Sequence, residues 1–164
     1  MEGIKIDKEN LEDIIEPLNH PGLTVLSARL LMGKTTLAMN IAMYKSEHCN
    51  ENVVIFSLEL PEKQLRDQYH IQDKSFIHII DDCPLTVSQI KEKLKMMTNT
   101  DLVIIDYLQL VESESEEKNR INKFMNIGKE LKKLSQELRQ YRTIIVVQMR
   151  SHIFCQAKVA PRIA

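Results

Sequence analysis

Residues 23–47 read LTVLSARLLMGKTTLAMNIAMYKSE, and this stretch decides the fold. The apolar run at 23–27 predicts a strand, and residues 34–47 have the composition of a helix. The loop between them, ARLLMGKT at 28–35, ends in glycine, lysine and threonine. Backbone N–H groups at a helix N-terminus surround an anion. This triplet also arises by chance, so its position between a strand and a helix is what favours a phosphate-binding loop.

The residues of this loop suit a nucleotide with a divalent cation. Lys34 can neutralise charge on the β- and γ-phosphates, Thr35 can ligate Mg²⁺, and Gly33 lets the backbone approach the phosphates closely. We therefore expect ATP and Mg²⁺ as ligands. The residues expected to contact them are Ala28, Arg29, Met32, Gly33, Lys34, Thr35 and Thr36.

The rest of the chain alternates apolar runs with helical patterns. The sequence predicts further strands at 52–58, 76–80, 102–105 and 144–147, and helices at 62–72, 86–97 and 124–141. The helix at 86–97 is expected to open with a capping box, because threonine is followed three residues later by glutamine. Strands that are apolar throughout are typical of a sheet covered on both faces. The predicted class is therefore α/β, with a mostly parallel sheet of about five strands flanked by helices.

One domain over residues 1–164 is expected. Residues 1–21 form a polar N-terminal extension, with Ile14, Ile15 and Leu18 as anchors of a short helix. The charged, serine-rich stretch ESESEEKNR at 112–120 is expected to be a mobile loop.

Three polar residues stand at the ends of predicted strands. Glu59 follows the second strand, Asp106 the fourth and Gln148 the fifth. Asp106 can hold Mg²⁺ beside Thr35, Glu59 can orient or deprotonate an attacking water, and Gln148 can sense the γ-phosphate. Each also has a plain structural explanation, which for Asp106 taken alone is the better one. Asp106 can be a carboxylate that caps the next turn, Glu59 an exposed strand-end acid that begins the next helix, and Gln148 a loop amide. Together with the phosphate-binding loop they predict one site, because ligands gather at the carboxyl ends of parallel strands.

Composition narrows the class of protein further. The 164 residues carry a net charge of −1, so no overall basic field indicates nucleic acid. The three cysteines, Cys49, Cys83 and Cys155, are far apart, which argues against a disulfide framework or a zinc site. No signal peptide or membrane-spanning stretch is recognisable, so we expect a cytoplasmic protein.

Four stretches resemble the ATPase domain of DnaB-type replicative helicases, a RecA-like family. They are GLTVLSARLLMGKTTLAMNIA (22–42), VVIFSLELPEKQL (53–65), LVIIDYLQLV (102–111) and the segment NR…LKKLSQEL…IIVVQ (119–148). The resemblance implies a RecA-like core in which Lys34 and Thr35 bind phosphates and Mg²⁺. It further implies that Glu59 activates water, that Asp106 is the Walker B acid, and that Gln148 couples the γ-phosphate to DNA. The family also tends to have alanine at the position of Ala28.

The chain departs from the family in several places. Leu30 and Leu31 stand where members commonly have a proline and a serine, and the segment between the helix at 62–72 and the strand at 76–80 is much shortened. The primase-contacting domain, the linker helix and the motif with the arginine finger are not recognisable, so 149–164 is expected to be an incomplete C-terminal end. We therefore expect slow or no ATP hydrolysis by the chain alone.

Three functions remain open at this stage. The chain can be the ATP-binding core of a replicative helicase or helicase-like replication protein, a degenerate relative that regulates a host helicase or loader without hydrolysis, or a RecA-like recombination accessory. Expected partners are primase, loader or helicase proteins, and a second copy of the chain. Single-stranded DNA is expected to bind weakly, because 112–117 is acidic, whereas Arg150, Lys158 and Arg162 form a thin basic set.

Overall fold

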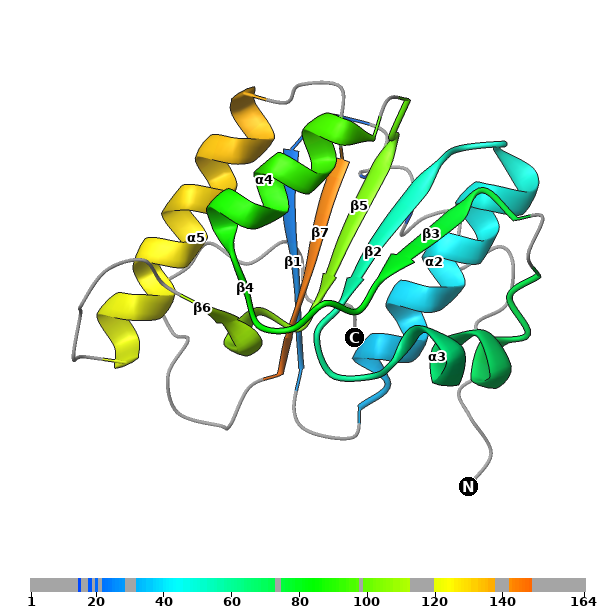
Figure 1. Ribbon diagram of the computed structural model, residues 1–164, viewed down its shortest axis with the longest axis horizontal. Helices are drawn as coiled ribbons and strands as arrows, with labels where there is room; N and C mark the ends of the chain where they lie inside the picture. The colour runs from blue at the N-terminus through cyan, green and yellow to red at the C-terminus, as the bar shows by residue number, and fades with distance from the viewer. Residues whose placement is uncertain are drawn as a thin grey trace.

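The structure is a computed structural model that describes residues 15, 18, 20, 22–28, 32–72, 75–97, 99–112, 120–137 and 142–148. Its main element is a five-stranded parallel sheet in the order β1-β7-β5-β2-β3 (Figure 1). The strands are β1 (Gly22–Ala28), β2 (Val53–Ser57), β3 (Ile77–Ile80), β5 (Leu102–Asp106) and β7 (Arg142–Gln148). The predicted α/β class with a parallel sheet is confirmed.

Helices cover both faces of the sheet. α2 (Lys34–His48) and α3 (Glu62–Tyr69) lie on one face, and α4 (Val87–Met96) and α5 (Arg120–Glu137) lie on the other (Figure 1). Alternate residues of β2 point to opposite faces of the sheet. Val53 and Ile55 pack against the face covered by α2, and Val54 and Phe56 pack against the face covered by α4 and α5. Because both faces of β2 are buried, its sequence does not alternate between apolar and polar residues.

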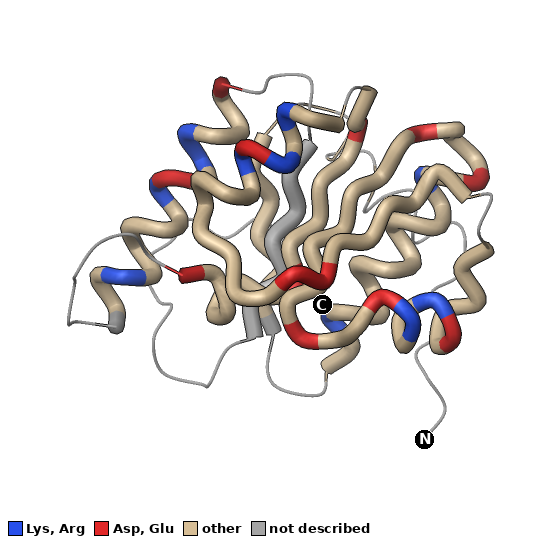
Figure 2. The backbone as a smooth tube through the Cα atoms, in the orientation of Figure 1, with Lys and Arg blue, Asp and Glu red and all other residues tan. Residues whose placement is uncertain are grey.

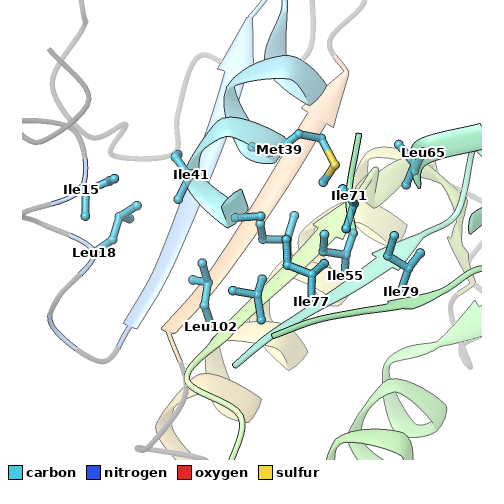
Figure 3. Packing of buried hydrophobic residues seen from close by; sticks show 14 residues of the cluster. Ile15, Leu18, Met39, Ile41, Ile55, Leu65, Ile71, Ile77, Ile79 and Leu102 are labelled. Carbon is cyan, nitrogen blue, oxygen red and sulfur yellow. The ribbon is translucent and has the colours of Figure 1, made fainter. Parts of the chain in front are cut away.

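The layer on the α2 side also includes residues from the N-terminal stretch. Ile15 and Leu18 are both buried and belong to the same cluster as Ile41 and Leu102 (Figure 3). Two of the three expected anchors of the extension are therefore in the core. Ile14 and most of 1–21 lie outside the described residues.

Two elements differ from the sequence prediction. The helix predicted over 62–72 ends at Tyr69, because His70 adopts a left-handed conformation with φ 53° and the N–H groups of His70 and Ile71 both bond to the carbonyl of Arg66. The sequence prediction also missed a small pair of parallel strands, β4 (Leu85–Thr86) and β6 (Val111–Glu112). β4 leads directly into α4, and β6 follows a 3₁₀ turn at Leu108–Leu110. Two-residue strands are too short to give a periodic pattern.

The loop predicted over 112–120 is wrong at both of its ends. Glu112 belongs to β6 and Arg120 begins α5, while 113–119 lies outside the described residues. The far end of the helix predicted over 124–141 is likewise only partly described, because 138–141 is outside the described part of the chain.

The predicted capping box at α4 is confirmed. The Thr86 hydroxyl accepts a hydrogen bond from the Gln89 amide at 3.3 Å, and the Gln89 side chain accepts one from the Thr86 amide at 2.9 Å. Thr86→Ala should therefore lower the free energy of unfolding by about 1 kcal/mol, since it leaves an amide at the helix start without its acceptor. Urea unfolding measures the change. Ser88→Ala, at an exposed position of the same turn, is the control and should stay within about 0.5 kcal/mol of wild type.

Candidate functional site

The N-terminus of α2 is where the structure places the predicted phosphate-binding residues. Gly33 precedes the helix with φ 73°, a left-handed conformation that glycine adopts without strain. A side chain there would meet no neighbour, so the backbone conformation rather than space explains the glycine. Lys34, Thr35 and Thr36 form the first turn of the helix, with no acidic side chain among them. This turn therefore presents backbone N–H groups and the positive end of the helix dipole at the edge of the sheet.

The remaining loop residues are only partly described. Ala28 is the last residue of β1, and Met32 is exposed, just before the helix. Arg29, Leu30 and Leu31 lie outside the described residues, so the expected effect of the two leucines stays a prediction.

The three strand-end residues lie at the same edge of the sheet as the start of α2. Asp106 is the last residue of β5, and it pairs in register with Ser57 at the end of β2. Glu59 stands two residues beyond that strand end. Gln148 is the last residue of β7 and pairs in register with Ala28. Parallel pairing thus brings together the strand ends that the sequence singled out.

Two of these strand-end residues, Asp106 and Glu59, share one electrostatic environment with the first turn of α2. Lys34 is buried, and this desolvation lowers the pKa of its ammonium group, while attraction to Asp106 and Glu59 opposes the shift. Asp106 is only 6% exposed, and burial raises its pKa to about 6. A hydrogen bond with the Thr35 side chain and the charge of Lys34 partly offset that rise, whereas Glu59 adds to it. A buried lysine and a buried aspartate therefore face a common site.

The Asp106 carboxylate fits a divalent cation. Its Oδ1 atom is buried and has no hydrogen-bond partner among the residues that the structure describes. A buried acceptor without a partner is costly and rare, so it points to a ligand that satisfies it. The hydrogen-bonded Thr35 hydroxyl supplies a second oxygen nearby. Hydroxyl and carboxylate oxygens are the ligands that Mg²⁺ takes beside substrate phosphates.

Two tyrosines near this edge were not singled out from the sequence. The Tyr69 hydroxyl of α3 lies 3.4 Å from the Thr36 hydroxyl and so links α3 to the first turn of α2. Burial raises the pKa of the Tyr107 phenol, and the charges of Glu59 and Asp106 add to the rise. Tyr107 could have been suspected because it follows Asp106 directly. The Tyr69 contact joins residues 33 positions apart and leaves no local signal.

The parallel sheet covered by helices on both faces defines the class of the protein as an α/β domain with the RecA-like fold. Solved structures support this class. A solved ATPase domain superposes with a TM-score of 0.69 at 24% identity, covering 80% of this chain and 58% of that one. A KaiC-like protein from Pyrococcus horikoshii superposes with a TM-score of 0.64 at 19% identity, covering 82% and 64%.

Sequence comparison identifies the family within this class. The model of the DnaB-like helicase C terminal domain matches residues 3–78 and 68–163, which together span nearly the whole chain. The chain therefore belongs to the DnaB-like helicase C-terminal domain family. The two matches overlap at 68–78, from the end of α3 to the start of β3, where the sequence indicates a shortened segment.

Individual relatives agree with this assignment. The replicative DNA helicase DnaB of Geobacillus stearothermophilus is 29% identical over 83% of this chain, and the replicative DNA helicase DnaC of Bacillus subtilis is 28% identical over the same share. The chain spans 37% of the length of each of these two relatives. A solved DnaB-like replicative helicase superposes with a TM-score of 0.69 at 22% identity, covering 86% of this chain and 44% of that one. In the described part of the chain, no helix is long and apolar enough to cross a membrane.

Proposed function

We propose that this chain binds ATP with Mg²⁺ at the N-terminus of α2, as the RecA-like core of a replicative DNA helicase or helicase-like replication protein. The observation that carries the proposal is a buried lysine, Lys34, in electrostatic contact with a buried carboxylate, Asp106, whose Oδ1 atom has no hydrogen-bond partner among the described residues. A cation and a carboxylate at this place suit a triphosphate and its metal ion, which bring charge of both signs.

Each side chain has one role in this proposal. Lys34 binds the β- and γ-phosphates, and the amides of the first turn of α2 surround the phosphate oxygens. Thr35 and Asp106 hold Mg²⁺, which neutralises charge on the phosphates when bound. Glu59 orients the attacking water and accepts its proton. Gln148 contacts the γ-phosphate, and Ala28, Arg29, Met32 and Thr36 complete the loop around the nucleotide.

Turnover by the chain alone should be slow. Within the described residues, Lys34 is the one positively charged group that interacts electrostatically with Asp106. The negatively charged Glu59 interacts with the same carboxylate and raises its pKa. Related NTPases gain about 10³–10⁵ in rate from an additional arginine that stabilises the transition state. We propose that self-association through RecA-like interfaces supplies this charge, so that the rate per chain rises with protein concentration. Brisk hydrolysis independent of concentration would contradict this proposal.

Lys34→Ala should weaken ATP binding by at least about 100-fold, because a charged hydrogen bond to phosphate is lost in a partly desolvated site. Titration of a fluorescent ATP analogue, with unlabelled ATP as competitor, measures the affinity. Lys129→Ala is the matched control, since Lys129 is exposed on α5, on the opposite face of the sheet. If both variants bind ATP as the wild type does, the nucleotide lies elsewhere.

The leucines at positions 30 and 31 favour a second function, a relative that docks on a replicative helicase or loader and regulates it without hydrolysis. Absence of binding at millimolar ATP, together with capture of a helicase in a pull-down, would favour that function over the first. The solved DnaB-like helicase to which this chain is similar is described together with its interactions with primase. Primase is therefore a further partner to test.

Contact with DNA is expected to be weak. Figure 2 shows acidic residues on the described loops at the carboxyl edge of the sheet, and both signs of charge along α3. Acidic loops repel the phosphate backbone of nucleic acid. A RecA-like recombination accessory, by contrast, would bind single strands clearly at physiological salt.

A further inference from the structure

We propose that Asp81 is a positioning residue that holds the bend carrying Glu59 against the phosphate site. The inference rests on the proposed function, because it concerns the water-activating role of Glu59. Asp81 directly follows β3, and β3 pairs with β2 in parallel. The register Phe56↔Ile80 brings the end of β3 beside the bend that follows β2.

The Glu59 side chain lies in a short bend, residues 58–61, between β2 and α3. It is exposed, yet its charge acts on both Lys34 and Asp106. The direction in which it points therefore depends on how the backbone of the bend is held. The hydroxyl of Ser57, the last residue of β2, donates to the Leu60 carbonyl in the bend at 2.5 Å. The Leu58 amide donates to the Asp106 carbonyl at 2.7 Å, which ties the start of the bend to β5.

The end of the bend is tied by Asp81. α3 begins after Pro61, whose side chain supplies no hydrogen bond to the helix start. The Asp81 carboxylate, contributed by the loop after the strand next to β2, accepts a hydrogen bond from the Glu62 amide at 2.8 Å. A carboxylate at this place satisfies an otherwise unpaired amide and suits the positive end of the helix dipole. Asp81 thus substitutes for the capping side chain that proline cannot provide.

A third tie comes from the same loop. The Cys83 thiol donates to the Leu58 carbonyl at 3.3 Å, so the loop after β3 contacts the backbone on both sides of Glu59, at Leu58 and at Glu62. The neighbouring Asp82 has a different partner: its carboxylate lies 2.7 Å from the Lys93 ammonium group of α4. Two adjacent aspartates therefore bind different elements, and Asp82 provides a matched control for Asp81.

The test compares Asp81→Ala, Asp81→Asn and Asp82→Ala with the wild-type chain in single-turnover ATP hydrolysis and in ATP and ADP binding. Asp81→Ala should lower the hydrolysis rate about tenfold while both affinities stay within about twofold, since small misplacement of a catalytic group affects the chemical step most. Asp81→Asn should restore most of the rate, because its amide oxygen can accept the same hydrogen bond. Asp82→Ala should match wild type. A rate that Asp81→Ala leaves unchanged overturns the inference, and so does an equal loss in Asp82→Ala.

If ATP hydrolysis is too slow to detect, amide hydrogen exchange on the ligand-free proteins tests whether Asp81 holds the bend that carries Glu59. Asp81→Ala should speed exchange across residues 58–62 about tenfold or more, and Asp82→Ala should not. Equal exchange in the two variants overturns the inference. This readout needs no nucleotide, so it is separate from the proposed function, which fails on its own if the wild type does not bind ATP.

Discussion

Asp106→Asn should make the ligand-free protein more stable and should remove the strengthening of nucleotide binding by Mg²⁺. Burial raises the pKa of Asp106 from 3.8 to about 6, so near pH 7.5 the fold holds an ionised carboxylate at a cost. A shift of this size corresponds to at most about 3 kcal/mol, and about 1–2 kcal/mol is expected because the asparagine amide still needs partners. The melting temperature should rise by several degrees, about 2–4 °C per kcal/mol.

The pH dependence of this difference follows from the sign of the shift. The folded state binds the proton more tightly than the unfolded state, so the stability due to Asp106 is fully present below about pH 4 and is lost as pH rises through about 6. The gap in melting temperature between Asp106→Asn and wild type should therefore shrink as pH falls from 7.5 to 4.5. Glu92→Gln, at an exposed position of α4, is the control. A variant less stable than wild type at pH 7.5, or one whose binding still responds to Mg²⁺, would contradict the assigned role.

Lys45→Ala should lower the free energy of unfolding by about 3 kcal/mol, the low end for a buried ion pair, because it removes the fully buried member of a partly buried pair. Lys45 is 1% exposed, and its ammonium group lies 2.9 Å from the Glu51 carboxylate, which is 17% exposed. Urea unfolding measures the loss. The double variant Lys45→Met, Glu51→Leu should regain much of the stability, since both charges are then absent. A loss below about 1 kcal/mol in the single variant would show that the pair is well solvated. Lys129→Ala again serves as the surface control.

The comparison of sequence with structure shows which features are local. β2 and β5 are predictable because each is a run of residues buried on both faces, and α4 because its capping box lies within four residues. The end of α3 is not predictable from the sequence. It depends on the left-handed conformation of His70, and the residue type histidine does not indicate that conformation. The β4–β6 pair joins two-residue strands 26 positions apart in register, and no window of sequence reveals it.

Some features of the candidate site can likewise be predicted from the sequence, and others cannot. Lys34, Thr35 and Asp106 can be singled out because strand ends and a helix start are visible in the sequence, and parallel pairing brings them together. Their roles, like those of Glu59 and Gln148, stay predictions. The support from the loop after β3 could not be predicted, because Asp81 contacts a helix start 19 positions away and Cys83 a carbonyl 25 positions away. The orphaned oxygen of Asp106 is also visible only in three dimensions.

The central claim is that the start of α2 and Asp106 together bind a nucleotide with its metal ion. The measurement that tests it most directly is calorimetric titration of the wild-type chain with ATP, with and without Mg²⁺. The account predicts saturable binding of one ATP per chain that is stronger with Mg²⁺ and is lost in Lys34→Ala. No heat of binding at millimolar ATP, or binding that is indifferent both to Mg²⁺ and to the loss of Lys34, would contradict it.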